Sequence, residues 1–493
     1  MATLKIIRDG NTGEFFFSPP LSLGKALESA GFPLAHPCGG RGVCGKCAVV
    51  ALEGDVSQPN AAELKACARL ACQAMLLGDA QVILPDSRQT EQIAIEGIDT
   101  PDILAPMDGR LGAAIDIGTT TLALKLCDLK TGCILSESAI LNPQTSVAAD
   151  VMGRIGAALN GELEKMQQQI LSALELLLED ACKRADRPRD QVDVLVAAGN
   201  TTMLYLLTGR NPECLSHAPF QADTLFGTRT SLLGCTAYLP SCMNAFVGAD
   251  ITCAVLASGI CGSSRTALLC DIGTNGEIAL WKDGVLYVTS TAAGPAFEGA
   301  GISCGCSSVT GAIDRVWVED GAIQLHTIGE APAVGICGSG LIDAVAALLQ
   351  INAIDETGAS EEETLPLGDG IALTNRDIRA IQLAKAAIAA GMATLLDTAG
   401  TNYADVETLY IAGGFGSRLN VTSAAAIGLI PQALASRIRV IGNASLSGSL
   451  RLLLNHNSVA AAEMIAGKAV HVDLGGNPRF NAHYMEQILF PDI

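Results

Sequence analysis

The stretch Ala267–Val288, ALLCDIGTNGEIALWKDGVLYV, follows the same pattern as the earlier stretch Gly112–Leu135, GAAIDIGTTTLALKLCDLKTGCIL. Each reads as an apolar strand, an Asp-Ile-Gly-Thr turn, a second strand, a turn that contains glycine, and a third strand. An Asp that ends a buried strand, followed by Gly-Thr, makes a tight hairpin whose N–H and hydroxyl groups can surround a phosphate. Because the turn occurs twice, the sequence predicts two related β-rich units.

The two turns supply candidate phosphate-binding and metal-binding residues. Their aspartates, Asp116 and Asp271, are placed to order water molecules on Mg²⁺, a cation that prefers oxygen ligands. The candidate phosphate contacts are Gly118, Thr119, Thr120, Gly273, Thr274 and Asn275. The chain has no G-x-x-x-x-G-K-[S/T] motif, and no G-x-G-x-x-G opens this region, so P-loop and dinucleotide-binding folds are disfavoured.

Composition narrows the class of protein. A chain of 493 residues exceeds one compact core and predicts several domains. An apolar fraction of 49% with only 4% aromatics is typical of soluble α/β proteins. The net charge of −20 argues against non-specific nucleic-acid binding, which needs clustered Lys and Arg. No long apolar run and no signal-peptide segment appear, so we expect no membrane span and a cytoplasmic location.

The 17 cysteines would stay reduced in the cytoplasm. Most are expected to be small buried side chains, because a free thiol packs like a small apolar group. This expectation applies to Cys127, Cys133, Cys182, Cys214, Cys235, Cys242, Cys253, Cys261 and Cys270.

The segment 1–88 reads as a small β-rich domain with a hairpin at its start and a short helix after it. It contains the loop HPCGGRGVCGKC, His36–Cys47, in which glycines alternate with cysteines. Glycines let a loop wrap closely, so that its backbone N–H groups reach the sulfides of a metal cluster. The loop therefore indicates an iron–sulfur site rather than part of a core.

Four cysteines have a spacing that suits such a site. Cys38 lies upstream of the close pair Cys44 and Cys47, and Cys72 lies later in the string RLACQ. The candidate metal ligands are Cys38, Cys44, Cys47 and Cys72. A disulfide framework fits a cytoplasmic chain poorly, and structural zinc usually shows two close pairs. Cys67 competes with Cys72 for the fourth position.

The motifs CGGRGVCGKC and RLACQ resemble those of 2Fe–2S ferredoxins, which implies a β-grasp domain and places the fourth ligand at Cys72. The gap of five residues after the first cysteine matches adrenodoxin-like proteins and the ferredoxin modules fused to activators of corrinoid proteins. A polar connector with two prolines follows, and we assign residues 89–110 to a linker that lets the small domain move.

The two Asp-Ile-Gly-Thr turns resemble the phosphate-1 and phosphate-2 loops of the actin, Hsp70 and sugar-kinase (ASKHA) superfamily. This resemblance implies an ATPase domain over residues 111–493, with one lobe at about 111–260 and the other at about 261–493. In that family the two α/β lobes close over ATP. The expected fold is therefore a multi-domain α/β protein, a ferredoxin followed by a two-lobed ATPase.

Other segments follow the same family order. AFVGADITCAVLASGI looks like the first connecting helix, which places Asp250 near the attacking water. VGICGSGLIDAVAALL looks like the second connecting helix, with Gly338 and Gly340 permitting a close helix crossing. TLYIAGGFGSRLN looks like the adenosine motif, which implies nucleoside contacts at Gly413, Gly414, Phe415 and Gly416.

The strings NPQTSVAADVMGRI, AAGNTTMLYLLTG and AAGPAFEGAGISCG, together with the ferredoxin motifs, resemble the reductive activators of corrinoid-dependent proteins. Within them, Glu298 either reaches a phosphate or metal, or caps helix amides. Asn200 with the threonines after it either lines the cleft or caps the following helix.

The resemblance implies an ATP-hydrolysing iron–sulfur reductase that returns the Co(II) corrinoid protein of a methyltransferase system to Co(I). Its cofactors would be a 2Fe–2S cluster, ATP and Mg²⁺. Its partners would be that corrinoid protein and an upstream low-potential electron donor, and a homodimer is expected. The alternatives are an activator of another low-potential metalloenzyme, a nucleotide-sensing electron-transfer module without ATP turnover, and a small-molecule kinase with a fused ferredoxin.

Overall fold

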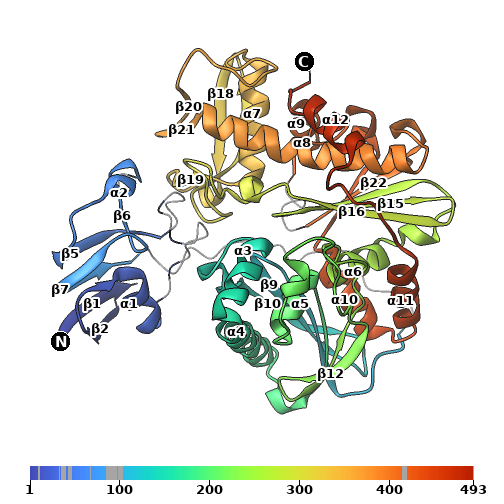
Figure 1. Ribbon diagram of the computed structural model, residues 1–493, viewed down its shortest axis with the longest axis horizontal. Helices are drawn as coiled ribbons and strands as arrows, with labels where there is room; N and C mark the ends of the chain where they lie inside the picture. Colours follow the sequence, from blue (N-terminus) through green and yellow to red (C-terminus); the bar gives the residue numbers. More distant parts are fainter. Residues whose placement is uncertain are drawn as a thin grey trace.

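The computed structural model describes residues 1–8, 11–32, 34, 40, 42, 47–66, 68–84, 97, 104–413 and 419–491. A small N-terminal domain stands beside a larger body that is divided into two lobes (Figure 1). The two lobes carry separate hydrophobic cores, and the small domain has its own.

The small domain is a mixed sheet crossed by one helix. Its strands are β1 (Ala2–Arg8), β2 (Asn11–Phe17), β3 (Leu21–Ser22), β5 (Ala51–Val56) and β7 (Met75–Ile83). β1 pairs antiparallel with β2 and parallel with β7, while α1 (Leu23–Ser29) buries its apolar face in the core. A separate two-stranded sheet and a short helix complete it: β4 (Ala48–Val49), β6 (Arg69–Leu70) and α2 (Ala61–Ala66). The predicted hairpin and helix are both present.

The two lobes are built on sheets that share five strands in the same order. The first sheet is β10-β9-β8-β11-β13, with β12 added beside β13, and the second is β16-β15-β14-β22-β23, with β24 added beside β16. The first sheet comprises β8 (Leu111–Ile117), β9 (Thr121–Asp128), β10 (Ile134–Leu141), β11 (Val192–Gly199), β12 (Thr228–Leu232) and β13 (Cys235–Leu239). The second comprises β14 (Ala267–Ile272), β15 (Gly276–Lys282), β16 (Val285–Thr291), β22 (Thr408–Ala412), β23 (Ile438–Gly442) and β24 (Val470–His471).

In each lobe an antiparallel hairpin meander is extended by parallel strands. β8 pairs antiparallel with β9 and parallel with β11, and β14 pairs antiparallel with β15 and parallel with β22. The first strand of each meander is buried, because helices cover both faces of its sheet. The predicted duplication is thus visible as a repeated strand order.

Helices cover the sheets and join the lobes. Those of the first lobe are α3 (Val151–Ala157), α4 (Leu163–Arg184), α5 (Thr201–Leu207) and α6 (Ala249–Ser258). Those that follow are α7 (Gly338–Gln350), α8 (Asn375–Thr398), α9 (Val421–Ala426), α10 (Ala444–Leu454), α11 (Ser458–Lys468) and α12 (Pro478–Glu486). The remaining strands, β17 (Ala312–Glu319), β18 (Ala322–Thr327), β19 (Gly335–Ile336), β20 (Thr364–Gly368) and β21 (Ile371–Thr374), form small sheets in the second lobe.

The chain returns to the first lobe near its end. α10 packs against α6, β8 and β11, and its leucines belong to the core of the first lobe. The core of the first lobe therefore includes a helix from beyond the predicted division at about residue 260. Gly448 makes this contact possible, because a Cβ there would lie 2.1 Å from the carbonyl oxygen of Cys253 on α6.

The assignment of α7 as the second connecting helix is wrong. α7 packs on β17 inside the second lobe, and the helix that crosses α6 is α10. Gly340 does permit a close approach, but to a strand, since a Cβ there would lie 2.3 Å from the carbonyl oxygen of Ile313 on β17. A glycine-rich helix start has the same sequence signature whether the close neighbour is a helix or a strand.

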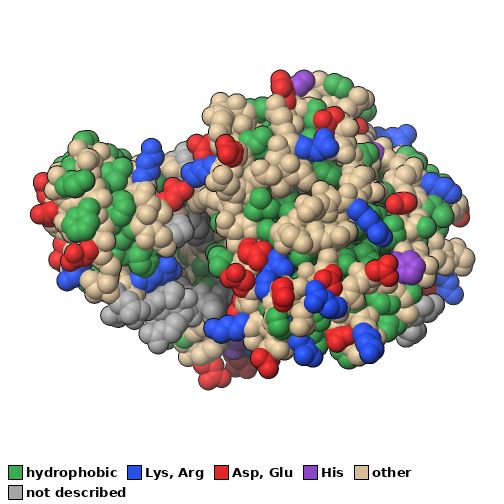
Figure 2. Space-filling view, turned by 90° about the horizontal axis from the view of Figure 1, so that it is seen from below, with side chains coloured by type: hydrophobic (Ala, Val, Ile, Leu, Met, Phe, Trp, Pro, Cys, Tyr) green, Lys and Arg blue, Asp and Glu red, His purple; other side chains and the backbone are tan. Residues whose placement is uncertain are grey.

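Two further expectations can be compared with the fold. Helix α8 is long and apolar enough to cross a membrane by length and composition, but 83% of its most apolar window is buried inside the protein, as in a core helix. Cys133 was expected to be buried and is exposed, because it follows the surface turn that ends β9. On the face drawn in Figure 2, acidic and basic side chains are interspersed over the large body.

The crossing of α6 and α10 predicts the effect of a small substitution. Gly448→Ala should lower the free energy of unfolding by roughly 1 to 3 kcal/mol, because the added methyl group meets the backbone of Cys253. Denaturant unfolding followed by circular dichroism measures this change. The matched control is Gly467→Ala on α11, where no atom lies within 4 Å of the new Cβ and helix propensity should make the change neutral or stabilising. Equal stability of the two variants would contradict the close crossing.

Candidate nucleotide site and iron–sulfur site

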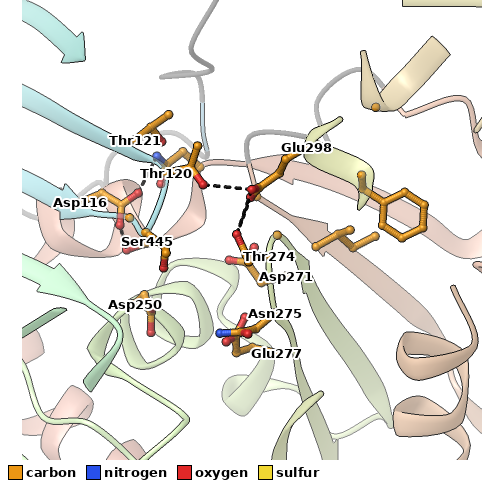
Figure 3. A pocket seen from close by; sticks show the side chains of 18 of the residues that line it. Asp116, Thr120, Thr121, Asp250, Asp271, Thr274, Asn275, Glu277, Glu298 and Ser445 are labelled. Atoms are coloured by element: carbon orange, nitrogen blue, oxygen red, sulfur yellow. Dashed lines mark hydrogen bonds between the residues drawn. The ribbon is translucent and has the colours of Figure 1, made fainter. Parts of the chain in front are cut away.

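A cavity of about 260 Å³ lies between the lobes and is lined by both Asp-Ile-Gly-Thr turns (Figure 3). The predicted residues that line it are Asp116, Gly118, Thr119, Thr120, Asp250, Asp271, Gly273, Thr274, Asn275 and Gly413. Residues nearly three hundred positions apart in the sequence, Asp116 and Gly413, thus meet in one place. Of the predicted adenosine motif, Gly414, Phe415 and Gly416 lie outside the described residues.

The two aspartates occupy equivalent places in the repeated sheets. Asp116 lies near the end of β8 and pairs across to β11, while Asp271 lies near the end of β14 and pairs across to Ala412 on β22. After Asp116 the chain turns tightly, since a Cβ on Gly118 would lie 2.6 Å from the carbonyl oxygen of Thr121. Strand ends and tight turns therefore bring the backbone of both loops to the cavity.

The carboxylate of Asp116 is held by the helix that returns from the second lobe. Asn443 Nδ2 donates to its Oδ2 at 2.9 Å, and Ser445 Oγ donates to its Oδ1 at 2.7 Å. Asn443 also caps α10 by accepting from the N–H of Leu446 at 2.8 Å. Sequence reasoning missed both residues, although a strand that ends in Gly-Asn-Ala-Ser before an apolar helix is a visible capping signal.

Asp250 enters the cavity from the start of α6. The helix begins close to β11, because a Cβ on Gly248 would lie 2.3 Å from the Cα of Asn200. Burial raises the pKa of Asp250 to about 8, with the charges of Asp116 and Asp271 acting in the same direction. Burial and the charge of Asp116 raise the pKa of Asp271 to about 7. Burial also raises the pKa of Asp116, against the hydrogen bonds from Ser445 and Asn443.

The cavity carries more negative charge than the described part of the chain compensates. Glu277 on β15 also lines it, and burial holds its pKa well above the ordinary value. No ion pair to any of the lining carboxylates is found among the described residues. Nor, in the same part of the chain, do three potential ligands converge closely enough to hold a metal directly. Separate hard-oxygen groups around an open cavity fit a hydrated divalent cation.

The motif Asn142–Ile155 braces the first loop from behind. Asn142 donates through Nδ2 to the carbonyl of Gly118 and through its N–H to the carbonyl of Thr120, both at 2.8 Å. Arg154, which is fully buried, donates to the carbonyl of Thr119 between them. With these carbonyls engaged on one side, the loop is held in a fixed orientation beside the cavity. Burial lowers the pKa of Arg154 to about 9.

Two residues with open roles can now be placed. Asn200 does both things expected of it: its Oδ1 accepts from the N–H of Met203 as the cap of α5, and its Nδ2 donates to Thr119 Oγ1 at 3.0 Å while it lines the cavity. Glu298 ends a short 3-10 helix (Pro295–Glu298) and makes no cap; its carboxylate accepts instead from Thr120 and Thr274, one from each loop (Figure 3).

The small domain brings two of the predicted cluster ligands together. The N–H of Cys72 points at Cys47 Sγ at 3.5 Å, and Gln73 Nε2 lies 3.6 Å from Cys72 Sγ. Gln73 also donates to the carbonyl of Gly40 in the cysteine loop at 2.6 Å. Amide donors around cysteine sulfurs are the surroundings that an iron–sulfur cluster needs. Cys38, Cys44 and the competitor Cys67 lie outside the described residues.

A β-grasp domain with a cysteine loop, joined to duplicated lobes around an acidic cavity, defines an iron–sulfur protein coupled to a nucleotide-binding ATPase fold. Three family models match: a 2Fe-2S iron-sulfur cluster binding domain over residues 6–77, the RACo middle region over 111–263, and the C-terminal domain of RACo, the ASKHA domain, over 265–493. These matches support a 2Fe–2S cluster in the first domain and nucleotide binding in the last.

Whole-chain relatives agree with the domain matches. A corrinoid activation enzyme, RamQ, from Eubacterium limosum is 34% identical over 77% of this chain and 70% of its own length. A [Co(II) methylated amine-specific corrinoid protein] reductase from Methanosarcina barkeri is 27% identical over 77% of each chain. The solved structure of a reductive activator for corrinoid, iron-sulfur protein is 27% identical, with a TM-score of 0.73, over 99% of this chain and 98% of that one.

The chain belongs to the family of reductive activators of corrinoid proteins. The predicted family, the ferredoxin followed by an ASKHA fold, and the predicted class of enzyme are thereby confirmed.

The buried carboxylates predict a pH-dependent stability. Asp250 and Asp271 have ordinary pKa values of 3.8 and folded values of about 8 and about 7, so the folded state binds more protons than the unfolded state between these limits. The unfolding midpoint of the nucleotide-free, chelator-treated protein should therefore fall as pH rises from about 5 to about 8. Thermal unfolding followed by circular dichroism measures the slope.

Asp250→Asn should make that slope shallower, because the amide does not titrate. The control is Asp355→Asn on an exposed turn, where the hydrogen bond from Thr357 lowers the pKa of the aspartate, so that its titration lies below the window. A slope that is the same in wild type and Asp250→Asn would contradict the raised pKa of Asp250.

The position of Cys72 predicts which cysteine completes the cluster. Cys72→Ala should abolish or strongly reduce the visible absorption and the iron content, because its amide already adjoins Cys47 Sγ. Cys67→Ala is the matched control and should retain both. The reverse result would assign the fourth ligand to Cys67.

Proposed function

We propose that this chain is an ATP-dependent enzyme that reduces the inactive Co(II) form of a partner corrinoid protein in a methyltransferase system to Co(I). The observation that carries the proposal is the joining, in one chain of this family, of a one-electron carrier to a cavity where both phosphate loops meet. When bound, the 2Fe–2S cluster supplies one electron, which converts Co(II) to Co(I) and leaves the cluster oxidised by one electron.

Coupling to ATP answers an energetic problem. If the cobalt potential lies below that of the cluster, each 100 mV of the gap opposes transfer by about 2.3 kcal/mol. Nucleotide shifts such an equilibrium only by its different affinity for two states of the protein or of the complex. Closure of the two lobes on ATP is the change that we assign to this task, and hydrolysis resets it.

Within the cavity each predicted residue has a defined part. The loops after Asp116 and Asp271 would contact phosphates, and the two aspartates, with Asp250, would order a hydrated Mg²⁺ and the attacking water. The uncompensated carboxylates around the cavity support a divalent cation there. We assign the nucleoside to the glycine strand end at Gly413, which lines the cavity and has no space for a side chain of its own, since a Cβ there would lie 2.6 Å from Asp271 Oδ1.

Partners beyond the corrinoid protein form part of the same proposal. An upstream low-potential donor must reduce the cluster, and exposed apolar side chains on the ferredoxin domain support protein docking there. Those side chains are Phe16, Val50, Leu64 and Leu77. Figure 2 shows hydrophobic side chains across the visible face of this domain. The family resemblance supports a homodimer, and a cytoplasmic location is part of the same proposal.

The test uses the holoprotein with reduced cluster, a Co(II) corrinoid protein and Mg²⁺ with ATP, and follows the Co(I) absorption. Asp271→Asn should leave the cluster spectrum intact and lower ATP-dependent Co(II) reduction at least tenfold, because it removes a carboxylate of the cavity and not of the ferredoxin domain. The matched control is Asp283→Asn, which removes the same charge from the exposed turn of the β15–β16 hairpin.

Loss of the cluster spectrum in Asp271→Asn would contradict this division of labour. Reduction by wild type at the same rate without ATP would contradict the coupling. Phosphorylation of a small molecule, with no effect on the corrinoid protein, would favour a kinase.

A further inference from the structure

Glu298 connects the two phosphate loops directly. Thr120 Oγ1, from the first lobe, donates to Glu298 Oε2 at 3.0 Å. Thr274 Oγ1, from the second lobe, lies 2.8 Å from Oε1 and 2.9 Å from Oε2 of the same carboxylate. In Figure 3 both threonine side chains point toward Glu298 across the space between the loops.

The carboxylate is held in place by its own segment. Gly299, the next residue, has a φ of +72°, and a Cβ there would lie 2.7 Å from the carbonyl oxygen of Cys306. Cys306 is fixed in turn, because its N–H donates to the carbonyl of Ile336 at 2.9 Å. The backbone from which the Glu298 side chain extends is therefore fixed by packing, while the side chain itself makes the bridge.

The chemistry of the bridge resembles that of a bound phosphate. A carboxylate and a terminal phosphate both present anionic oxygens that accept hydrogen bonds from hydroxyl groups. A threonine hydroxyl has one proton, so the donors of Thr120 and Thr274 that face the cavity are already engaged by Glu298. A phosphate that takes these donors must displace the carboxylate, since two anions at one site repel each other.

We propose that Glu298 occupies the place of the terminal phosphate in the nucleotide-free protein and is displaced by ATP but not by ADP, so that it determines specificity for the triphosphate. This inference rests on the proposed function, in which ATP binds between the two loops. The third phosphate carries the oxygens that replace the carboxylate at both hydroxyls. A diphosphate lacks them and leaves the bridge intact.

The nearby charges agree with an exchange of anions. Arg154, behind Thr119, is the cation whose charge acts on Glu298. The other acidic groups that line the cavity are Asp116, Asp250, Asp271 and Glu277. Adding a phosphate beside Glu298 would place one more negative group among them, whereas replacing the Glu298 carboxylate by a phosphate adds less negative charge.

The experiment measures binding of Mg²⁺ with ADP and of Mg²⁺ with a non-hydrolysable ATP analogue to the full-length holoprotein by calorimetry. In Glu298→Ala the ATP analogue should bind about tenfold more tightly, because two hydroxyl–carboxylate hydrogen bonds no longer have to break. Affinity for ADP should change less than about threefold. Glu298→Gln keeps an acceptor without the charge and should give a smaller gain.

Two variants separate this explanation from its rivals. Glu277→Gln replaces another buried carboxyl group that lines the same cavity but is bonded to Ser290 and Asn275, and it should give no gain specific to the triphosphate. In a Thr274→Val background the effect of Glu298→Ala should shrink, because the bridge is already weakened. Retained circular dichroism and cluster absorption verify folding of each variant.

Weaker binding of the ATP analogue to Glu298→Ala would overturn the inference and make Glu298 a ligand of the nucleotide or its metal. Equal gains for ADP and the ATP analogue, or an equal gain in Glu277→Gln, would also overturn it and reduce the effect to general charge relief. Failure of wild type to bind either nucleotide would contradict the proposed function instead.

Discussion

The constraint on which the structure depends is that two aspartates at equivalent strand ends must share one cavity with further carboxylates. Taking an unpaired carboxylate out of water costs several kcal/mol, even after the protein relaxes. At Asp116 this cost is offset by hydrogen bonds from two side-chain donors, Asn443 and Ser445. At Asp250 and Asp271 the raised pKa values indicate that protons neutralise the carboxylates in the absence of a bound cation. The nucleotide-free site is therefore an unfavourable arrangement that the rest of the fold has to hold.

The crossing of α6 and α10 is what holds it. Each helix follows a parallel strand of its own lobe, and each begins at the cavity, so the positive ends of both helix dipoles face the carboxylates. The arrangement links the two lobes, because α10 follows a strand of the second lobe and, with its cap residue Asn443, supplies the donors for Asp116 of the first. Close contact at Gly448 keeps the helices near each other. A shift of the second lobe relative to the first must therefore change the surroundings of Asp116.

Local sequence patterns were sufficient to predict the features that depend on local geometry. The Asp-Ile-Gly-Thr turns, the hairpins around them and the residues that line the cavity from these turns were visible, because strand, turn and strand follow one another in the chain. The identity of the helix that crosses α6 could not be predicted in this way. Both α7 and α10 begin with small residues, and only their tertiary packing distinguishes one from the other. Asn443 and Ser445 were missed for the same reason: nothing near residue 443 indicates a partner at residue 116. The role of Glu298 was left undecided, because a carboxylate at a turn can either reach a phosphate or metal or cap helix amides, and the sequence does not show its neighbours.

The attachment of the ferredoxin domain bears on where the energy of ATP can act. Among the described residues, one ion pair joins that domain to the large body, between Glu28 on α1 and Lys165 on α4 at 3.2 Å, and both side chains are more than a third exposed. Exposed pairs of this kind contribute about 0 to 1 kcal/mol, which is less than the cost of even 100 mV of uphill transfer. A change transmitted through this contact would therefore be too small to drive the reaction. The proposed function therefore assigns the larger effect to surfaces that are created or removed when the lobes move on nucleotide, through the affinity of each nucleotide state for the corrinoid partner. On this reasoning the ferredoxin domain delivers the electron, and the lobes make the acceptor able to receive it.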